Sequence, residues 1–160
     1  MDRDGVINKK AKEHEYITSR DGFFRNNKIK EFIKYCNDND AKVVIISNQH
    51  WIGKGIFSVD DLHIIHQHMS RDLAKIWAKI DWFYFCPHLV SDNCDCRKPK
   101  PWMLQQACDD LQVFDKKEMI FIGDSQSDIE CADNFWIDAF KIETDSFEDY
   151  FDQIIPLITS

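Results

Sequence analysis

Three cysteines and a histidine lie within eleven residues in the middle of the chain: Cys86, His88, Cys94 and Cys96. Their spacing is C-x-H-x5-C-x-C, and three thiolates with one imidazole are a common tetrahedral ligand set for a structural zinc ion. The alternatives are a disulfide, which would leave one cysteine unpaired, and chance thiols in a loop. We favour zinc, because loop 86–96 has few apolar residues and metal binding would supply the energy that folds it. Four protein ligands would leave the metal no open position for catalysis.

Aspartates near both ends of the chain form a second candidate site. Taken alone, Asp2 and Asp4 could be a charged turn in solvent, but Asp124 follows an apolar run in the stretch GDSQSD. Together these three residues offer the hard oxygen ligands that Mg²⁺ prefers. Ser47 and Lys98 could hold the oxygens of a phosphate there. A carboxylate nucleophile, a second carboxylate for proton transfer, a divalent cation and a lysine are the groups that phosphoryl transfer needs.

The hydrophobic pattern indicates the elements that would bring these residues together. Apolar runs predict strands at 41–47, 81–86, 118–124 and 138–142, and helical spacing predicts helices at 28–39, 57–77, 101–114 and 125–136, with an amphipathic segment at 150–155. This alternation predicts a doubly wound α/β fold with a mainly parallel sheet and helices on both faces. Sites in such sheets form outside the carboxyl ends of the strands, which is where Ser47, Cys86 and Asp124 fall.

Length and composition fit one soluble domain over residues 1–160. The hydrophobic fraction is 44% and the formal net charge is −8, ordinary values for a globular chain of this size. The charge argues against binding a nucleic-acid backbone but allows a small anionic substrate where positive charge is concentrated. The sequence has no apolar run of the roughly 20 residues that a membrane span needs, and no signal-peptide pattern. We expect a cytoplasmic monomer without membrane or nucleic-acid partners.

Taken in order, the motifs resemble those of the haloacid dehalogenase superfamily of aspartate-nucleophile phosphatases. DRDGVIN, IISNQ, CRKPKP and GDSQSD match its four motifs, and CPH and CDC resemble the zinc loop of one branch. That branch contains the histidinol-phosphate phosphatases and the D-glycero-D-manno-heptose 1,7-bisphosphate phosphatases. The resemblance covers the whole chain and implies a Rossmann-like domain. No large insertion follows the first or second motif, so we expect no cap domain.

The resemblance also implies a role for each motif residue. Asp2 would be the nucleophile that forms an aspartyl-phosphate, and Asp4 would protonate the leaving alkoxide and then activate water. Ser47 and Lys98 would hold the transferring phosphoryl group. Mg²⁺ would be bound by the carboxylates of Asp2 and Asp124 and by the main-chain oxygen of Asp4.

Four further residues would contact the substrate: Asn48, Gln49, Lys54 and Arg97. Two glycines flank Lys54, in a loop that could wrap a second anionic group. This segment resembles that of the heptose bisphosphate enzymes, although Lys54 replaces their arginine. We therefore expect a D-glycero-D-manno-heptose 1,7-bisphosphate 7-phosphatase, with a histidinol-phosphate phosphatase as the alternative. A nucleic-acid 3′-phosphatase is a further alternative, but it would need a basic groove, which the net charge of −8 argues against. An inactive binding module would have lost a motif aspartate, whereas Asp2, Asp4 and Asp124 are all present.

The start of the chain departs from the family pattern. The nucleophile of these enzymes ends a buried central strand, but only Met1 precedes Asp2. Either the native chain begins upstream and the first strand is truncated in this numbering, or the protein has lost its first strand. Its loss would leave main-chain groups of the neighbouring strands unpaired, at a cost of about 1–3 kcal/mol each. The 160-residue form is therefore expected to be poorly stable or nearly inactive unless another segment fills the gap.

Overall fold

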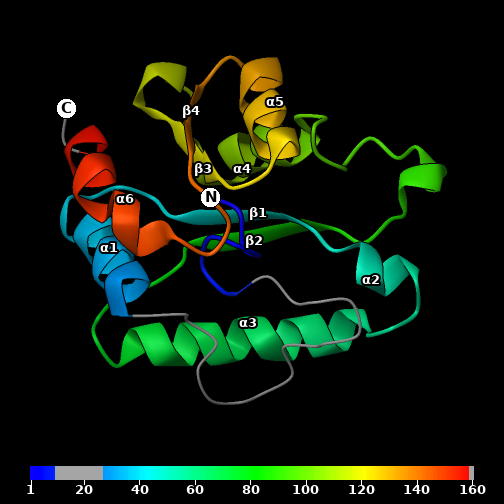
Figure 1. Cartoon of the computed structure of the whole chain (residues 1–160), viewed down its shortest axis with the longest axis horizontal. Coiled ribbons are helices and arrows are strands. Elements are labelled where there is room, and N and C mark those ends of the chain that lie inside the picture. Colours follow the sequence, from blue (N-terminus) through cyan, green and yellow to red (C-terminus); the bar gives the residue numbers. More distant parts are fainter. Residues whose placement is uncertain (10–26, 159–160) are drawn as a thin grey trace.

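The computed structural model describes residues 1–9 and 27–158, and strands and helices alternate along them (Figure 1). The strands are β1 (Val44–Asn48), β2 (Trp82–Cys86), β3 (Ile120–Gly123) and β4 (Asp138–Lys141). The helices are α1 (Asn27–Asp38), α2 (His50–Gly53), α3 (Val59–Ala74), α4 (Trp102–Leu111), α5 (Gln126–Phe135) and α6 (Phe147–Ile154), with single 3₁₀ turns at Val90–Asp92, Lys116–Glu118 and Ile155–Leu157. Each predicted strand and helix is present, and its ends lie within a few residues of the predicted ones.

The four strands form two parallel pairs, β1 with β2 and β3 with β4. Met1 and Asp2 lie between the pairs. The Met1 amino group donates to the carbonyl oxygen of Val44 at 2.8 Å, and the Ile46 N–H donates to that of Met1 at 3.0 Å. On the other side, the Asp2 N–H donates to the carbonyl oxygen of Ile122 at 2.9 Å. These two residues connect β1 to β3 and place Asp2 beside the ends of both.

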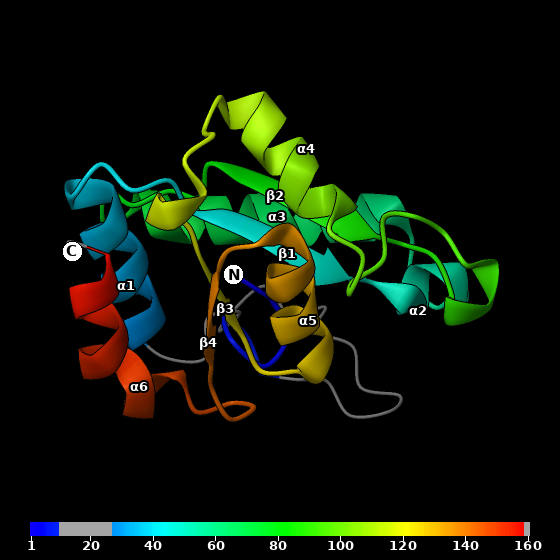
Figure 2. The ribbon, with the colours of Figure 1, turned by 90° about the horizontal axis from the view of Figure 1, so that it is seen from above.

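Helices cover both faces of the β1–β2 pair. On one face His66 of α3 stacks on Phe83 of β2, with ring centroids 4.1 Å apart. On the other face Oη of Tyr84 donates to Asp110 of α4 at 2.8 Å. Because neighbouring strand residues point to opposite faces, α3 and α4 lie on opposite sides of the pair, as Figures 1 and 2 show. Helix α5 packs on β3–β4 and α1 packs on α6, which completes the predicted doubly wound arrangement.

Capping residues set the start of two helices. Ser58 and Asp61 form a capping box at the start of α3, and Ser125 and Asp128 form another at the start of α5. In both boxes the aspartate accepts from the serine N–H, at 2.8 Å for Asp61 and 3.0 Å for Asp128. Oγ of Ser58 also accepts from the Asp61 N–H at 3.1 Å. Among the described α-helices only α2 was not predicted, because the residues after β1 were interpreted as a loop.

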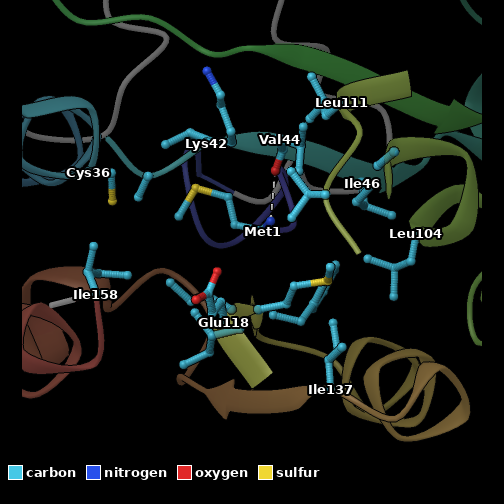
Figure 3. A pocket seen from close by; sticks show the side chains of 18 of the residues that line it. Met1, Cys36, Lys42, Val44, Ile46, Leu104, Leu111, Glu118, Ile137 and Ile158 are labelled. Carbon is cyan, nitrogen blue, oxygen red and sulfur yellow. Dashed lines mark hydrogen bonds between the residues drawn. The ribbon is translucent and has the colours of Figure 1, made fainter. Parts of the chain in front are cut away.

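A cavity of about 390 Å³ lies behind Met1, between the two strand pairs (Figure 3). Val44 and Ile46 of β1 line one side, and Ile120 and Ile122 of β3 line the other. Burial and, to a smaller extent, a nearby lysine lower the pKa of the Met1 amino group to about 5. The cavity continues from Met1 toward the amino ends of β1 and β3, which is the path a strand preceding Asp2 would take.

Candidate active site

Five of the predicted site residues meet at the carboxyl ends of β1 and β3: Asp2, Asp4, Ser47, Lys98 and Asp124. Ser47 belongs to β1, and Asp124 directly follows β3. Lys98 reaches the same point from the loop behind the cysteine cluster. In a parallel arrangement the carboxyl ends of neighbouring strands lie at one edge, which explains why residues so distant in sequence converge.

Lys98 is buried and its ammonium group is held on three sides. Nζ lies 2.8 Å from Oδ1 of Asp2, 2.6 Å from Oδ1 of Asp128 and 2.8 Å from the carbonyl oxygen of Ile46. Burial alone would lower the pKa of Lys98, but the two carboxylates outweigh it and raise that pKa. The lysine therefore stays charged inside the site.

Three carboxylates gather around this ammonium group. Oxygens of Asp2, Asp124 and Asp128 all lie within 4.8 Å of one another, and all three residues are buried. Burial raises the pKa of Asp2 to about 6, although Lys98 opposes the change. Three buried carboxylates around one lysine leave an excess of negative charge, and their oxygens are hard ligands. This donor set fits Mg²⁺.

The sequence interpretation missed Asp128. It is fully buried in the first turn of α5, four residues after Asp124. A Cβ at Gly123 would collide with the Asp128 side chain, and a Cβ at Gly5, whose φ is +94°, would collide with that of Asp124. Both glycines thus let the backbone pass against a site aspartate. The sequence did contain a signal for Asp128, which is the second aspartate of GDSQSD. A capping residue at a strand-to-helix turn points back toward the end of the strand, where the site lies.

The Asp4 side chain lies apart from the three carboxylates. Arg3 contacts it with Nε at 3.2 Å and Nη2 at 2.9 Å, and Nδ2 of Asn8 and Nε2 of Gln49 each donate to it at 2.8 Å. Burial would raise the pKa of Asp4, but the Arg3 guanidinium and these hydrogen bonds lower it. The sequence analysis also missed Arg3 and Asn8. They lie in the first motif, but neither residue type there indicated a contact with Asp4.

The amides of Asn48 and Gln49 are engaged inside the protein. Asn48 accepts from the Lys98 N–H at 3.0 Å and donates to the Lys98 carbonyl oxygen at 3.1 Å. Gln49 donates to Oγ of Ser47 at 2.7 Å as well as to Asp4. Both residues border the site and hold Lys98, Ser47 and Asp4 in position, and their contact with substrate stays a prediction.

The four soft ligands also converge. Successive contacts among Sγ of Cys86, Cys94 and Cys96 and Nδ1 of His88 measure 3.2 to 3.6 Å. Metal bonds of about 2.3 Å to sulfur and 2.0 Å to nitrogen would place tetrahedral ligand atoms roughly 3.5–3.8 Å apart. All six cysteines of the chain are free, so none forms the alternative disulfide. The arrangement fits a closed zinc site.

Positive side chains lie at the rim beside this cluster. Nη1 of Arg97 donates to the carbonyl oxygen of His88 at 3.2 Å, and Nζ of Lys54 lies 4.4 Å from the ring centre of Trp51. Burial lowers the pKa of His50, and the charges of Lys54 and Arg97 lower it further. Helix α2 and the loop after β2 project together beyond the carboxyl ends of β1 and β2 (Figures 1 and 2).

Comparison with known proteins assigns the family. Residues 1–151 match the family described as polynucleotide kinase 3 phosphatase. The chain belongs to this family. A D-glycero-alpha-D-manno-heptose-1,7-bisphosphate 7-phosphatase of Campylobacter jejuni is 37% identical over 84% of this chain and 74% of its own length. A D-glycero-beta-D-manno-heptose-1,7-bisphosphate 7-phosphatase of Rhodopseudomonas palustris is 33% identical over 97% of this chain and 88% of its own length.

A solved structure supports the same assignment. The crystal structure of D,D-heptose 1,7-bisphosphate phosphatase from B. bronchiseptica, complexed with magnesium and phosphate, has a TM-score of 0.81 and 29% identity. The match covers 95% of this chain and 83% of that one. Membership of the polynucleotide kinase 3 phosphatase family confirms the resemblance to haloacid dehalogenase phosphatases, and with it the predicted fold and enzyme class. No described helix is long and apolar enough to cross a membrane.

Proposed function

We propose that this protein is a Mg²⁺-dependent phosphomonoester hydrolase that removes the 7-phosphate of D-glycero-D-manno-heptose 1,7-bisphosphate. The observation that carries the reaction type is the buried Lys98 ammonium, 2.8 Å from Asp2 and in a cluster with Asp124 and Asp128. This pairing puts a carboxylate nucleophile next to a fixed positive charge. The names of the relatives support the sugar bisphosphate.

The chain's own residues would perform two steps. In the first, a carboxylate oxygen of Asp2 attacks phosphorus, and the P–O bond to the sugar breaks as Asp4 gives its proton to the leaving alkoxide. In the second, Asp4 takes a proton from a water molecule, whose oxygen attacks the same phosphorus and releases inorganic phosphate from Asp2. Lys98 and Ser47 would orient the phosphoryl oxygens in both steps.

Two metal ions would serve different purposes. Asp2, Asp124 and Asp128, with the main-chain oxygen of Asp4, would hold Mg²⁺, which when bound neutralises charge on the phosphate. The Cys86, His88, Cys94 and Cys96 set would hold zinc as a structural ion.

The rim supports a substrate with a second anionic group. The charges of Lys54 and Arg97 lower the pKa of His50, so both cations lie within electrostatic reach of this rim histidine. A second phosphate of the sugar would pair with them.

The formal net charge of −8 disfavours a polynucleotide substrate despite the name of the family. Free cysteines suit a reducing compartment, and we expect the enzyme to act in the cytoplasm as a monomer.

A substrate screen tests the proposal. Phosphate release should be measured for both anomers of the heptose bisphosphate, for histidinol phosphate and for an oligonucleotide with a 3′-phosphate, with Mg²⁺ and with a chelator. We expect the heptose bisphosphates to have the highest kcat/KM, and activity to disappear with the chelator and in Asp2→Asn. Preferred cleavage of histidinol phosphate or of the oligonucleotide would assign the enzyme to that substrate instead.

A further inference from the structure

The side chains of Arg3, Asp4 and Gln49 form a closed hydrogen-bonded ring. Nη2 of Arg3 donates to the two carboxylate oxygens of Asp4 at 3.0 and 2.9 Å, and to Oε1 of Gln49 at 2.8 Å. Nε2 of Gln49 closes the ring by donating to Oδ2 of Asp4 at 2.8 Å. Each of the three side chains therefore contacts the other two.

The ring is buried at Arg3 and Gln49 and open to solvent at Asp4. Arg3 and Gln49 are 6% and 1% exposed, whereas the Asp4 side chain keeps 26% of its surface accessible. Nη1 of Arg3 has no hydrogen-bond partner among the described residues. A buried guanidinium with an unused donor costs stability, so packing alone does not account for an arginine here.

We propose that Arg3 is a positioning residue that aims the Asp4 carboxyl group at the leaving oxygen of the substrate. The inference rests on the proposed phosphatase function. An aspartate side chain rotates about two bonds, and proton transfer requires its oxygen within hydrogen-bond reach of the alkoxide. The planar guanidinium offers several donors in a fixed geometry, which a lysine ammonium does not.

Gln49 connects this ring to the phosphoryl site. The same Nε2 that contacts Asp4 also donates to Oγ of Ser47 at 2.7 Å. The orientation of Asp4 is therefore tied to the hydroxyl that would bind the transferring phosphoryl group. Loss of Arg3 would leave the carboxyl group held only by the single hydrogen bonds from Asn8 and Gln49, while Asp2, Lys98 and the three-carboxylate cluster stay in place.

The leaving group of the substrate distinguishes positioning from a structural role. An alkoxide is a poor leaving group and needs the proton from Asp4, whereas a nitrophenolate departs with little help from an acid. The later hydrolysis of the aspartyl-phosphate is common to both esters, so the comparison uses kcat/KM, which reports the steps up to departure of the leaving group. If Arg3 acts through Asp4, its loss lowers kcat/KM for alkyl phosphates far more than for aryl phosphates. A damaged fold would lower both to a similar extent.

The test compares Arg3→Gln with wild type on p-nitrophenyl phosphate and on the best alkyl phosphate of the substrate screen. We expect kcat/KM for the alkyl ester to fall by roughly a hundredfold and kcat/KM for the aryl ester to fall less than about fivefold. The matched control is Arg71→Gln, at an exposed arginine in the last turn of α3, which should behave as wild type. Circular dichroism monitors the fold of each variant.

Each outcome decides the inference. Equal losses for the two esters, or an unchanged alkyl rate, overturn the positioning role while leaving the proposed function intact. A wild-type protein that cleaves neither ester overturns the proposed function and this inference with it. If Arg3→Gln does not fold, Arg3→Lys must show the selective alkyl loss, because it keeps the charge but not the guanidinium geometry; equal losses in that variant overturn the inference.

Discussion

Lys98 carries a positive charge into the protein interior by pairing with two carboxylates and a carbonyl group. Its partners Asp2 and Asp128 lie 2.8 and 2.6 Å from Nζ. A phosphoryl group arriving at Asp2 would meet an ammonium group that is already desolvated and oriented. Such preorganised charge needs no reorganisation as negative charge develops, which is the main source of electrostatic catalysis.

We expect Lys98→Ala to lower kcat by roughly a hundredfold or more, since removing one preorganised group that stabilises a developing oxyanion costs about 3 kcal/mol. The matched control is Lys100→Ala in the same loop, whose ammonium group pairs with exposed Asp95 at 2.9 Å. Steady-state kinetics at saturating Mg²⁺ measures both variants, and circular dichroism should show that both remain folded. Near-normal turnover of Lys98→Ala would mean that another cation stabilises the phosphoryl group.

The sequence was sufficient to find the residues at the carboxyl ends of strands. Asp124 and Ser47 could be placed because an apolar run ending in a polar residue marks the edge where sites form. Asp128 and Arg3 were missed, because their roles depend mainly on side-chain directions that a sequence does not show. Asp128 turns back from a helix to reach Lys98, and Arg3 folds onto the residue next to it.

At the scale of elements, the loop between β2 and α4 links the cysteine cluster to the active site. Lys98 follows Cys96 by two residues, and Asn48 holds the Lys98 main chain through two hydrogen bonds. Arg97, between them, contacts the carbonyl oxygen of His88 within the cluster. A metal that fixes the loop would therefore also fix the position of the lysine.

We expect one zinc ion per chain, and we expect Cys94→Ala to lose both the zinc and most of the phosphatase activity. The physical reason is that loop 86–96 has little apolar surface to hold it, so Lys98 would no longer be presented to Asp2. Cys108→Ala is the matched control, since Cys108 lies in α4 outside the cluster and should keep both. Elemental analysis and phosphate release measure the two effects. A disulfide among the cluster cysteines, without metal, would contradict the zinc assignment.

The contact between α3 and β2 should make stability depend on pH. Burial lowers the pKa of His66 to about 3; Arg3 and His63 add to this effect and Asp4 opposes it. The unfolded chain, with an ordinary histidine pKa near 6.5, therefore binds a proton before the native state does. Stability contributed by neutral His66 is complete above about pH 6.5 and is lost as the pH falls toward the native pKa.

We expect His66→Phe to flatten this dependence. Between pH 7.5 and 5.0 the wild type should lose about 2 kcal/mol more unfolding free energy than the variant, at about 1.4 kcal/mol per pH unit below the unfolded pKa. The same substitution at exposed His63, a smaller contributor than burial to the low pKa of His66, should keep most of the wild-type dependence. Urea unfolding at the two pH values measures the difference, and parallel curves for wild type and His66→Phe would refute the assignment.

At the scale of the whole molecule, the order of strands and helices was predictable but the joining of the strands was not. Local patterns identified each of the four described strands, because an apolar run is a property of a few adjacent residues. Whether β1 and β3 share a sheet depends on what lies between them. Among the described residues, only Met1 and Asp2 lie between β1 and β3 and bond to both. The cavity behind Met1 separates the rest of the two strands.

The strand edges on both sides of that cavity are oriented to receive a further strand. The carbonyl oxygens of Val44 and Ile122 accept hydrogen bonds from Met1 and Asp2. In a strand the N–H and C=O of one residue point to the same side. The N–H groups of Val44 and Ile122 therefore point into the space between the pairs, where an extended segment joined to Met1 could bond to both.

We expect a fusion of about five apolar residues, a typical strand length, before Met1 to stabilise the protein and raise its Mg²⁺-dependent turnover. The fusion replaces the buried Met1 amino group, whose pKa is lowered to about 5, with an uncharged amide. About four new main-chain hydrogen bonds at about 1 kcal/mol each would raise the melting temperature by roughly 8–16 °C at 2–4 °C per kcal/mol. The matched control is a fusion of equal length made of glycine and serine, which removes the same charge but brings no apolar side chains. Calorimetry and phosphate release should show gains with the apolar fusion that greatly exceed those of the control. If the chain without a fusion already equals the apolar fusion in both measurements, no strand is needed between β1 and β3.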